Sequence, residues 1–155
     1  MRNNLVAMMD HIGLNKVLSI DSAADLFENR TDLVHFTSAL RYPVFKTGKN
    51  FNGSPLLLKE QVDAWFAEEC KLLKSAIYIP LGPNVSLAMD YLVKEGFVNE
   101  SQVLAGLPHP SGANAERIKY FIGEKPKELL SKKTNPDKLD CVKQKLITTI
   151  SKLSL

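Results

Sequence analysis

The stretch SAIYIPLG, Ser75–Gly82, consists almost entirely of apolar residues. Apolar residues on both faces are typical of a central strand in a parallel sheet, where helices cover each side. Two further segments have the composition of strands, namely LVHFTS at Leu33–Ser38 and QVLAGLP at Gln102–Pro108. The sequence therefore predicts three parallel strands.

Helical patterns alternate with these strands. Apolar residues recur at helical spacing, and Asp21, Asn84 and Asn135 stand where a helix would be capped. The expected helices cover residues 3–12, 23–28, 57–73, 85–94, 115–122 and 136–155, the last being a basic amphipathic helix. Strands that alternate with helices predict the α/β class, here a three-layer α/β/α arrangement with a small, mainly parallel central sheet.

Size and composition are those of an ordinary globular protein. A chain of 155 residues predicts a single domain over 1–155. No apolar run is long enough to cross a bilayer and no signal peptide is visible, so we expect a cytoplasmic protein without a membrane partner. Cys70 and Cys141 stand alone, and the three histidines lack the spacing of a metal site. We expect neither a metal nor a cofactor.

Positive charge is concentrated in the last third of the chain. Residues 112–155 hold ten Lys and Arg against five Asp and Glu. This excess suits a phosphate-rich partner such as DNA. A Lys-rich helix face that is merely solvated gives the same pattern, so both interpretations stay open here.

The loop GLPHPSGAN, Gly106–Asn114, combines the stiffest and the most flexible residues around one imidazole. Pro108 and Pro110 fix φ on both sides of His109, while Ser111 adds a hydroxyl and Gly112 a backbone that a ligand can approach closely. Such a loop can present donors to an anion. The alternative is an ordinary turn in which the histidine satisfies a neighbouring carbonyl.

Within this loop, LPHPSGAN resembles the second signature motif of the uracil-DNA glycosylase superfamily, which reads His-Pro-Ser or Asn-Pro-Ser followed by Pro or Gly. HFTSALRYP resembles the central strand of that superfamily, and IYIPLGPNVSLAM resembles its Leu-Gly turn. The resemblance covers roughly Leu33 to Phe121. It implies an enzyme that flips a base out of DNA and hydrolyses its N-glycosidic bond, with uracil or another damaged base as the substrate.

The resemblance also implies roles for single residues. His109 matches the catalytic histidine that hydrogen-bonds the base carbonyl and stabilises negative charge on the departing base. Ser111 matches the serine that contacts a phosphate, and Ser38 stands where the family places the asparagine that reads the base. The remaining residues expected to contact DNA are Gly112, Ala113, Asn114 and Arg117.

The first motif of the superfamily is absent from the sequence. That motif is a Gly-rich loop with a proline and a residue that positions the attacking water, and no glycine here has such a setting. Enzyme activity is therefore left open. One alternative is a catalytically silent DNA-binding or protein-interaction module. Another is a fragment that lacks the N-terminal strand, whose open sheet edge would pair with a second copy as a homodimer.

Overall fold

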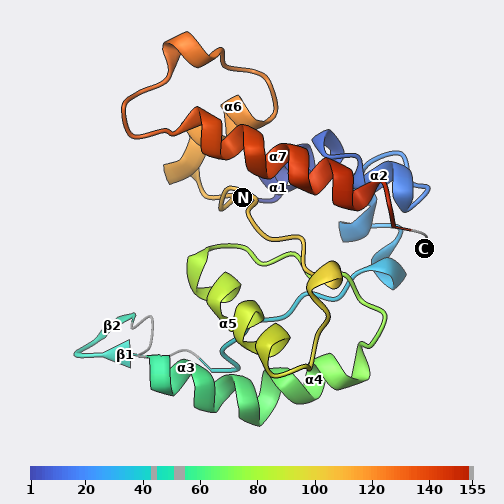
Figure 1. The fold of residues 1–155 in the computed structure, drawn as a ribbon, viewed down its shortest axis with the longest axis vertical. Coiled ribbons are helices and arrows are strands. Elements are labelled where there is room, and N and C mark those ends of the chain that lie inside the picture. The colour runs from blue at the N-terminus through green and yellow to red at the C-terminus, as the bar shows by residue number, and fades with distance from the viewer. Residues whose placement is uncertain (43–44, 51–54, 154–155) are drawn as a thin grey trace. The chain divides into compact units, whose positions relative to one another are not determined.

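The computed structural model describes residues 1–42, 45–50 and 55–153, and it is mainly helical. The chain divides into two compact units. The first unit combines Met1–His35 with Gly106–Leu155, and the second is Phe36–Ala105. Figure 1 shows their helices along the chain. The single domain over 1–155 stays a prediction.

Helices make up the first unit. They are α1 (Arg2–His11), α2 (Leu14–Val17), α6 (Ala115–Phe121) and α7 (Pro136–Ile150), joined by 3₁₀ turns at Ala23–Phe27, Thr31–Leu33, Gly112–Asn114 and Lys127–Leu129. Helix α1 packs against α2, α6 and the turn at Ala23–Phe27, while α6 packs against α7. The helices predicted at 3–12 and 115–122 are confirmed. The C-terminal helix begins at Pro136 as predicted and ends at Ile150.

Asp10 fixes the turn that follows the first two helices. Its carboxylate accepts hydrogen bonds from Ser22 Oγ at 2.6 Å and from the backbone N–H of Ala23 at 2.7 Å. The hydroxyl of Ser22 in turn accepts from the N–H of Ala24 at 3.1 Å. The cap predicted at Asp21 is therefore wrong by one residue, and the helix predicted at 23–28 is a 3₁₀ turn over Ala23–Phe27.

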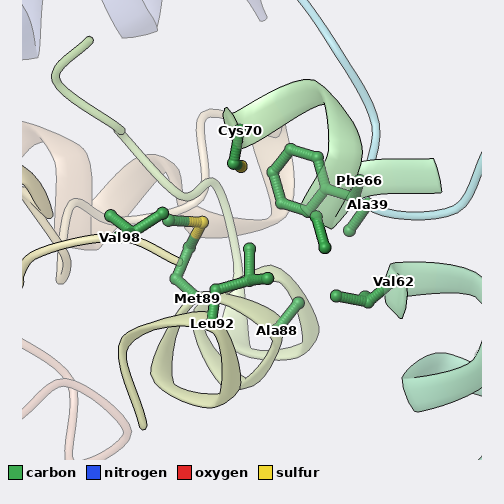
Figure 2. Packing of buried hydrophobic residues seen from close by; sticks show 9 residues of the cluster. Ala39, Val62, Phe66, Cys70, Ala88, Met89, Leu92 and Val98 are labelled. Carbon is green, nitrogen blue, oxygen red and sulfur yellow. The ribbon is translucent and has the colours of Figure 1, made fainter. Parts of the chain in front are cut away.

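The second unit is built around two helical segments. One contains α3 (Pro55–Gln61), a π-helical stretch at Val62–Phe66 and α4 (Ala67–Leu72), and the other is α5 (Pro83–Lys94). Phe66 and Cys70 face Met89 and Leu92 in the core of this unit (Figure 2). The buried members of the cluster are Ala39, Val62, Phe66, Ala67, Cys70, Ala88, Met89, Leu92 and Val98. The helices predicted at 57–73 and 85–94 are confirmed, although α5 begins earlier, at Pro83.

A short hairpin occupies part of the region between Leu40 and α3. Strand β1 (Phe45–Lys46) pairs antiparallel with β2 (Lys49–Asn50). Thr47 and Gly48 form the turn with φ of 51° and 74°, and two positive φ values match the twist of a two-residue hairpin.

The predicted α/β class is wrong. Among the described residues, no central parallel sheet forms, and the β1–β2 hairpin is the one sheet. Leu33–Ser38 contains the end of a 3₁₀ turn and no strand. The other two predicted strands meet at a single parallel bridge between Tyr78 and Val103. There the N–H of Tyr78 donates to Gln102 O at 2.7 Å, and that of Leu104 donates to Tyr78 O at 2.8 Å.

Two residues stop this bridge from becoming a sheet. The next N–H in a parallel ladder would come from residue 80, which is a proline and has none. On the other side, the N–H of Gln102 donates to Asn99 O at 3.0 Å within a 3₁₀ turn. The side-chain amide of Gln102 donates to Lys74 O at 2.8 Å and Ala76 O at 2.9 Å. The side chain of Gln102 thus binds two carbonyls that the backbone N–H groups of a neighbouring strand would bind in a sheet.

The absence of a central sheet also changes the expected interfaces. A homodimer was predicted through an open sheet edge, and that sheet does not form in the described part of the chain. Dimerisation stays a prediction, without that edge as its basis. No helix within residues 1–42, 45–50 and 55–153 has both the length and the apolar character needed to cross a membrane.

Two neighbouring aromatic residues in the π-helical stretch should differ in their effect on stability. Phe66 is 4% exposed, whereas Trp65 is 44% exposed and packs edge-on against Tyr42 at 6.4 Å between ring centroids. We expect Phe66→Ala to lower the free energy of unfolding by about 3–5 kcal/mol, because it leaves a cavity. Trp65→Ala, the matched control, should cost about 1 kcal/mol. Urea unfolding measures both, and equal losses would contradict this assignment of the core.

Candidate functional site: the His109 loop

Buried residues anchor the His109 loop on both sides of the imidazole. Leu107, Pro108 and Pro110 are buried, whereas His109 itself is half-buried. Asn4, on α1, donates from Nδ2 to the carbonyl of Pro110 at 3.0 Å. Because prolines fix φ and this carbonyl is bound to a helix, the backbone on both sides of His109 is restricted.

A backbone hydrogen bond selects one tautomer of His109. The N–H of Ser111 donates to His109 Nδ1 at 3.3 Å. A ring nitrogen that accepts a hydrogen bond carries no proton, so the proton of the neutral imidazole lies on Nε2. The neutral side chain therefore offers Nε2–H as a donor. Such a group can bind a carbonyl oxygen or stabilise an oxyanion.

Asn114 braces the loop from within. Its Nδ2 donates to His109 O at 3.2 Å and to Ser111 Oγ at 3.3 Å, and its Oδ1 accepts from Arg117 at 3.1 Å. These bonds use both N–H groups of the amide. The hydroxyl of Ser111 accepts one of them and keeps its own proton, with which it can donate to a ligand.

Arg117 connects the loop to the segment before α7. Its guanidinium donates to Asn114 Oδ1 at 3.1 Å and to Lys133 O at 3.3 Å. The side chain is exposed, and Asn114 links its guanidinium to the hydroxyl of Ser111 through two hydrogen bonds. A cation and a hydroxyl held in one hydrogen-bonded network can both donate to an anion.

Glu116 holds the same segment at several points. Its carboxylate accepts from Lys125 Nζ at 2.8 Å, from Ser131 N at 3.1 Å and Oγ at 2.6 Å, and from Thr134 Oγ1 at 2.6 Å. The ammonium of Lys125, followed by these hydroxyl and backbone donors, lowers the pKa of Glu116 far below its ordinary value of 4.5. The carboxylate is therefore ionised at neutral pH.

Four of the predicted site residues lie in one hydrogen-bonded chain, namely His109, Ser111, Asn114 and Arg117. Gly112 and Ala113 are exposed on the 3₁₀ turn between them. Ser38 belongs to the second unit, where it is exposed beside the buried Ala39.

Asn4 and Glu116 were missed by sequence reasoning. Asn4 binds a residue 106 positions away in the chain, and the partners of Glu116 lie in an irregular segment. No local sequence pattern therefore predicts the role of either residue.

Comparison with known proteins places the chain beside a bacterial relative. It is similar to YoxB, an uncharacterized protein of Bacillus subtilis (strain 168), with 36% identity over 132 residues. The aligned region covers 81% of this chain and 52% of YoxB, so the chain spans about half the length of that relative. No family model matches the chain. No solved structure matches it either. The resemblance to uracil-DNA glycosylases stays a prediction.

The two glycines of the loop should respond differently to an added methyl group. Gly106 has φ of +110°, and a Cβ there would lie 2.6 Å from Val142 Cγ1 of α7. A Cβ at Gly112 would meet no described residue within 4 Å beyond its chain neighbours. We expect Gly106→Ala to lower the free energy of unfolding by about 1–3 kcal/mol, through strain and overpacking. Gly112→Ala should change it by less than about 0.5 kcal/mol. Thermal and urea unfolding test this, and similar effects would contradict the packing of the loop on α7.

The ion pair and hydrogen bonds of Glu116 predict a pH dependence of stability. A carboxylate whose pKa is lowered by folding stabilises the folded state above its unfolded pKa, and this contribution is lost as pH falls through the folded pKa. The free energy of unfolding of the wild-type chain should therefore exceed that of Glu116→Gln by its full amount above about pH 5, and this difference should shrink progressively below pH 4.5. Urea unfolding of both chains between pH 7 and pH 3 gives this difference. An advantage independent of pH would show that the carboxylate is not held as described.

Proposed function

We propose that the chain binds DNA that presents an unstacked uracil or related base to the His109 loop. In this proposal, Nε2–H of His109 donates to a carbonyl oxygen of the base. Ser111 and Arg117 contact the adjacent phosphate. Gly112 and Ala113 allow the strand to approach the backbone of the loop. We place this binding in the cytoplasm, as the sequence predicts.

The observation that carries the proposal is the tautomer of His109. The bond from Ser111 N–H to His109 Nδ1 leaves the neutral imidazole with a donor at Nε2, and uracil presents a carbonyl oxygen at C4 where cytosine presents an amino group. An imidazole with the opposite tautomer would present an acceptor there and could not bind a carbonyl in its neutral form. The motif resemblance independently implies the same donor role.

Charge supports a phosphate-bearing ligand in particular. Residues 106–155 belong to one unit and hold the basic excess, with ten Lys and Arg against five Asp and Glu. Arg117 lies within this region and is hydrogen-bonded to the loop through Asn114. Phosphate contacts supply sequence-independent affinity for DNA, while a base contact adds preference for one base.

Hydrolysis of the N-glycosidic bond is a separate prediction of the resemblance. It requires a group that positions the attacking water, and the sequence offers none in a recognisable setting. Binding and base release are therefore distinct activities, and each requires its own assay.

The test compares oligonucleotides that are identical except for one base. Affinity of the wild-type chain is measured for single-stranded DNA with one uracil and for the same strand with cytosine. We expect a preference for uracil that His109→Ala removes, with a loss of about fivefold in affinity for the uracil strand, as one hydrogen bond contributes about 1 kcal/mol. His109→Gln, which keeps an N–H donor, should retain part of the preference.

His11→Ala is the matched control, since it removes an exposed histidine of the same unit that lies against Phe121 at 6.1 Å between ring centroids. It should leave the preference unchanged. Equal affinity for the two strands, or a preference that survives in His109→Ala, would sink the proposal. Uracil release that depends on His109 would extend the function to hydrolysis, and binding without release would limit it to recognition.

A further inference from the structure

A loop between α6 and α7 carries two adjacent lysines, Lys132 and Lys133. The loop makes a wide excursion with one short helical turn at Lys127–Leu129 (orange in Figure 1). Both lysine side chains are exposed. Neither has a carboxylate partner among the described residues, whereas Lys125, Lys127 and Lys143 each pair with one.

Glu116 fixes the backbone on both sides of these lysines. It binds the N–H and hydroxyl of Ser131, which precedes them, and the hydroxyl of Thr134, which follows them. Thr134 is 6% exposed. The N–H of Thr134 also donates to Ser131 O at 3.0 Å, which closes a turn over the two lysines. The two ammonium groups therefore project from a fixed turn, which lowers the conformational entropy lost when they bind a ligand.

Arg117 connects this turn to the His109 loop. Its guanidinium bridges Lys133 O and Asn114 Oδ1, and Asn114 itself binds His109 O and Ser111 Oγ. The lysine turn is therefore connected to the His109 loop by one side chain, that of Arg117. A ligand that occupies the loop and extends beyond it in this direction would meet positive charge.

We propose that the turn Ser131–Thr134 is a second phosphate-binding element, with Lys132 and Lys133 contacting backbone phosphates next to the nucleotide bound at His109. This inference rests on the proposed function, and it assigns these phosphate contacts to a segment outside the resembling motifs. Glu116 is a positioning residue, because it holds the turn and does not touch the ligand.

The competing partner is an anionic lipid surface. Leu129 is 66% exposed near the lysines, and an apolar side chain beside basic residues is a feature of membrane-surface binding. Connection of the turn to the His109 loop through Arg117 favours DNA, because one continuous strand can occupy both elements.

The salt dependence of DNA binding tests the inference. For single-stranded DNA, the slope of log affinity against log salt concentration is about −0.7 for each neutralised phosphate. The double variant Lys132→Gln with Lys133→Gln should therefore have a slope whose magnitude is smaller than that of the wild-type chain by about 1.4. The factor by which this variant binds DNA more weakly than the wild-type chain should consequently fall by about sevenfold between 50 and 200 mM salt. The double variant Lys145→Gln with Lys152→Gln makes the same change of charge on exposed residues of the C-terminal segment and is the control.

Glu116→Gln separates positioning from net charge. It removes a negative charge and keeps both lysines, so an effect of net charge alone would raise the affinity for DNA. Loss of the fixed turn should instead lower the affinity and reduce the slope. A raised affinity in this variant would overturn the positioning role.

The remaining outcomes are distinguishable. If the wild-type chain binds the uracil strand but the lysine variant keeps the slope of the control variant, the inference is overturned while the proposed function stands. If the wild-type chain binds no DNA even at 50 mM salt, both are overturned together. Lysine-dependent binding to phosphatidylserine vesicles, with the DNA slope unchanged, would assign the turn to a lipid surface and also overturn the inference.

Discussion

A proline has no N–H group, and Pro80 stands where a parallel ladder from Tyr78 would need its next donor. Pairing with Val103 therefore ends after one bridge, and the 3₁₀ turn that consumes the N–H of Gln102 prevents extension in the other direction. Apolar segments that cannot join a sheet must be buried by other elements. In the second unit these are the helical segment 55–72 and helix α5, whose side chains meet in the cluster of Phe66, Cys70, Met89 and Leu92.

Side chains replace regular pairing in several irregular segments. The amide of Gln102 binds two carbonyls that a strand would otherwise satisfy, and Asp10 binds the first donors of the turn at Ala23–Phe27. Glu116 does the same for the segment before α7. Buried or half-buried backbone groups need partners, and without a sheet these partners come from single polar side chains. Each such residue consequently supports a whole segment.

The His109 loop follows this pattern, and its chemistry depends on it. Asn4 and the buried prolines hold the backbone, while the N–H of Ser111 decides which ring nitrogen carries the proton. Asn114 donates both of its N–H groups to the loop and accepts from Arg117, so it supports the site from within. The groups left for a ligand are the Nε2–H of His109, the hydroxyl of Ser111 and the nearby positive charge.

The sequence by itself determined the longer helices, because α1, α5 and α7 have apolar spacing and end signals that act within a few residues. It also determined that His109 stands between two fixed φ angles. Tertiary structure decided that the segments 75–82 and 102–108 meet at one parallel bridge and form no sheet, because pairing depends on which N–H groups are free. It likewise decided the tautomer of His109 and the roles of Asn4 and Glu116, since their partners lie in other segments and distant hydrogen bonds leave no local pattern.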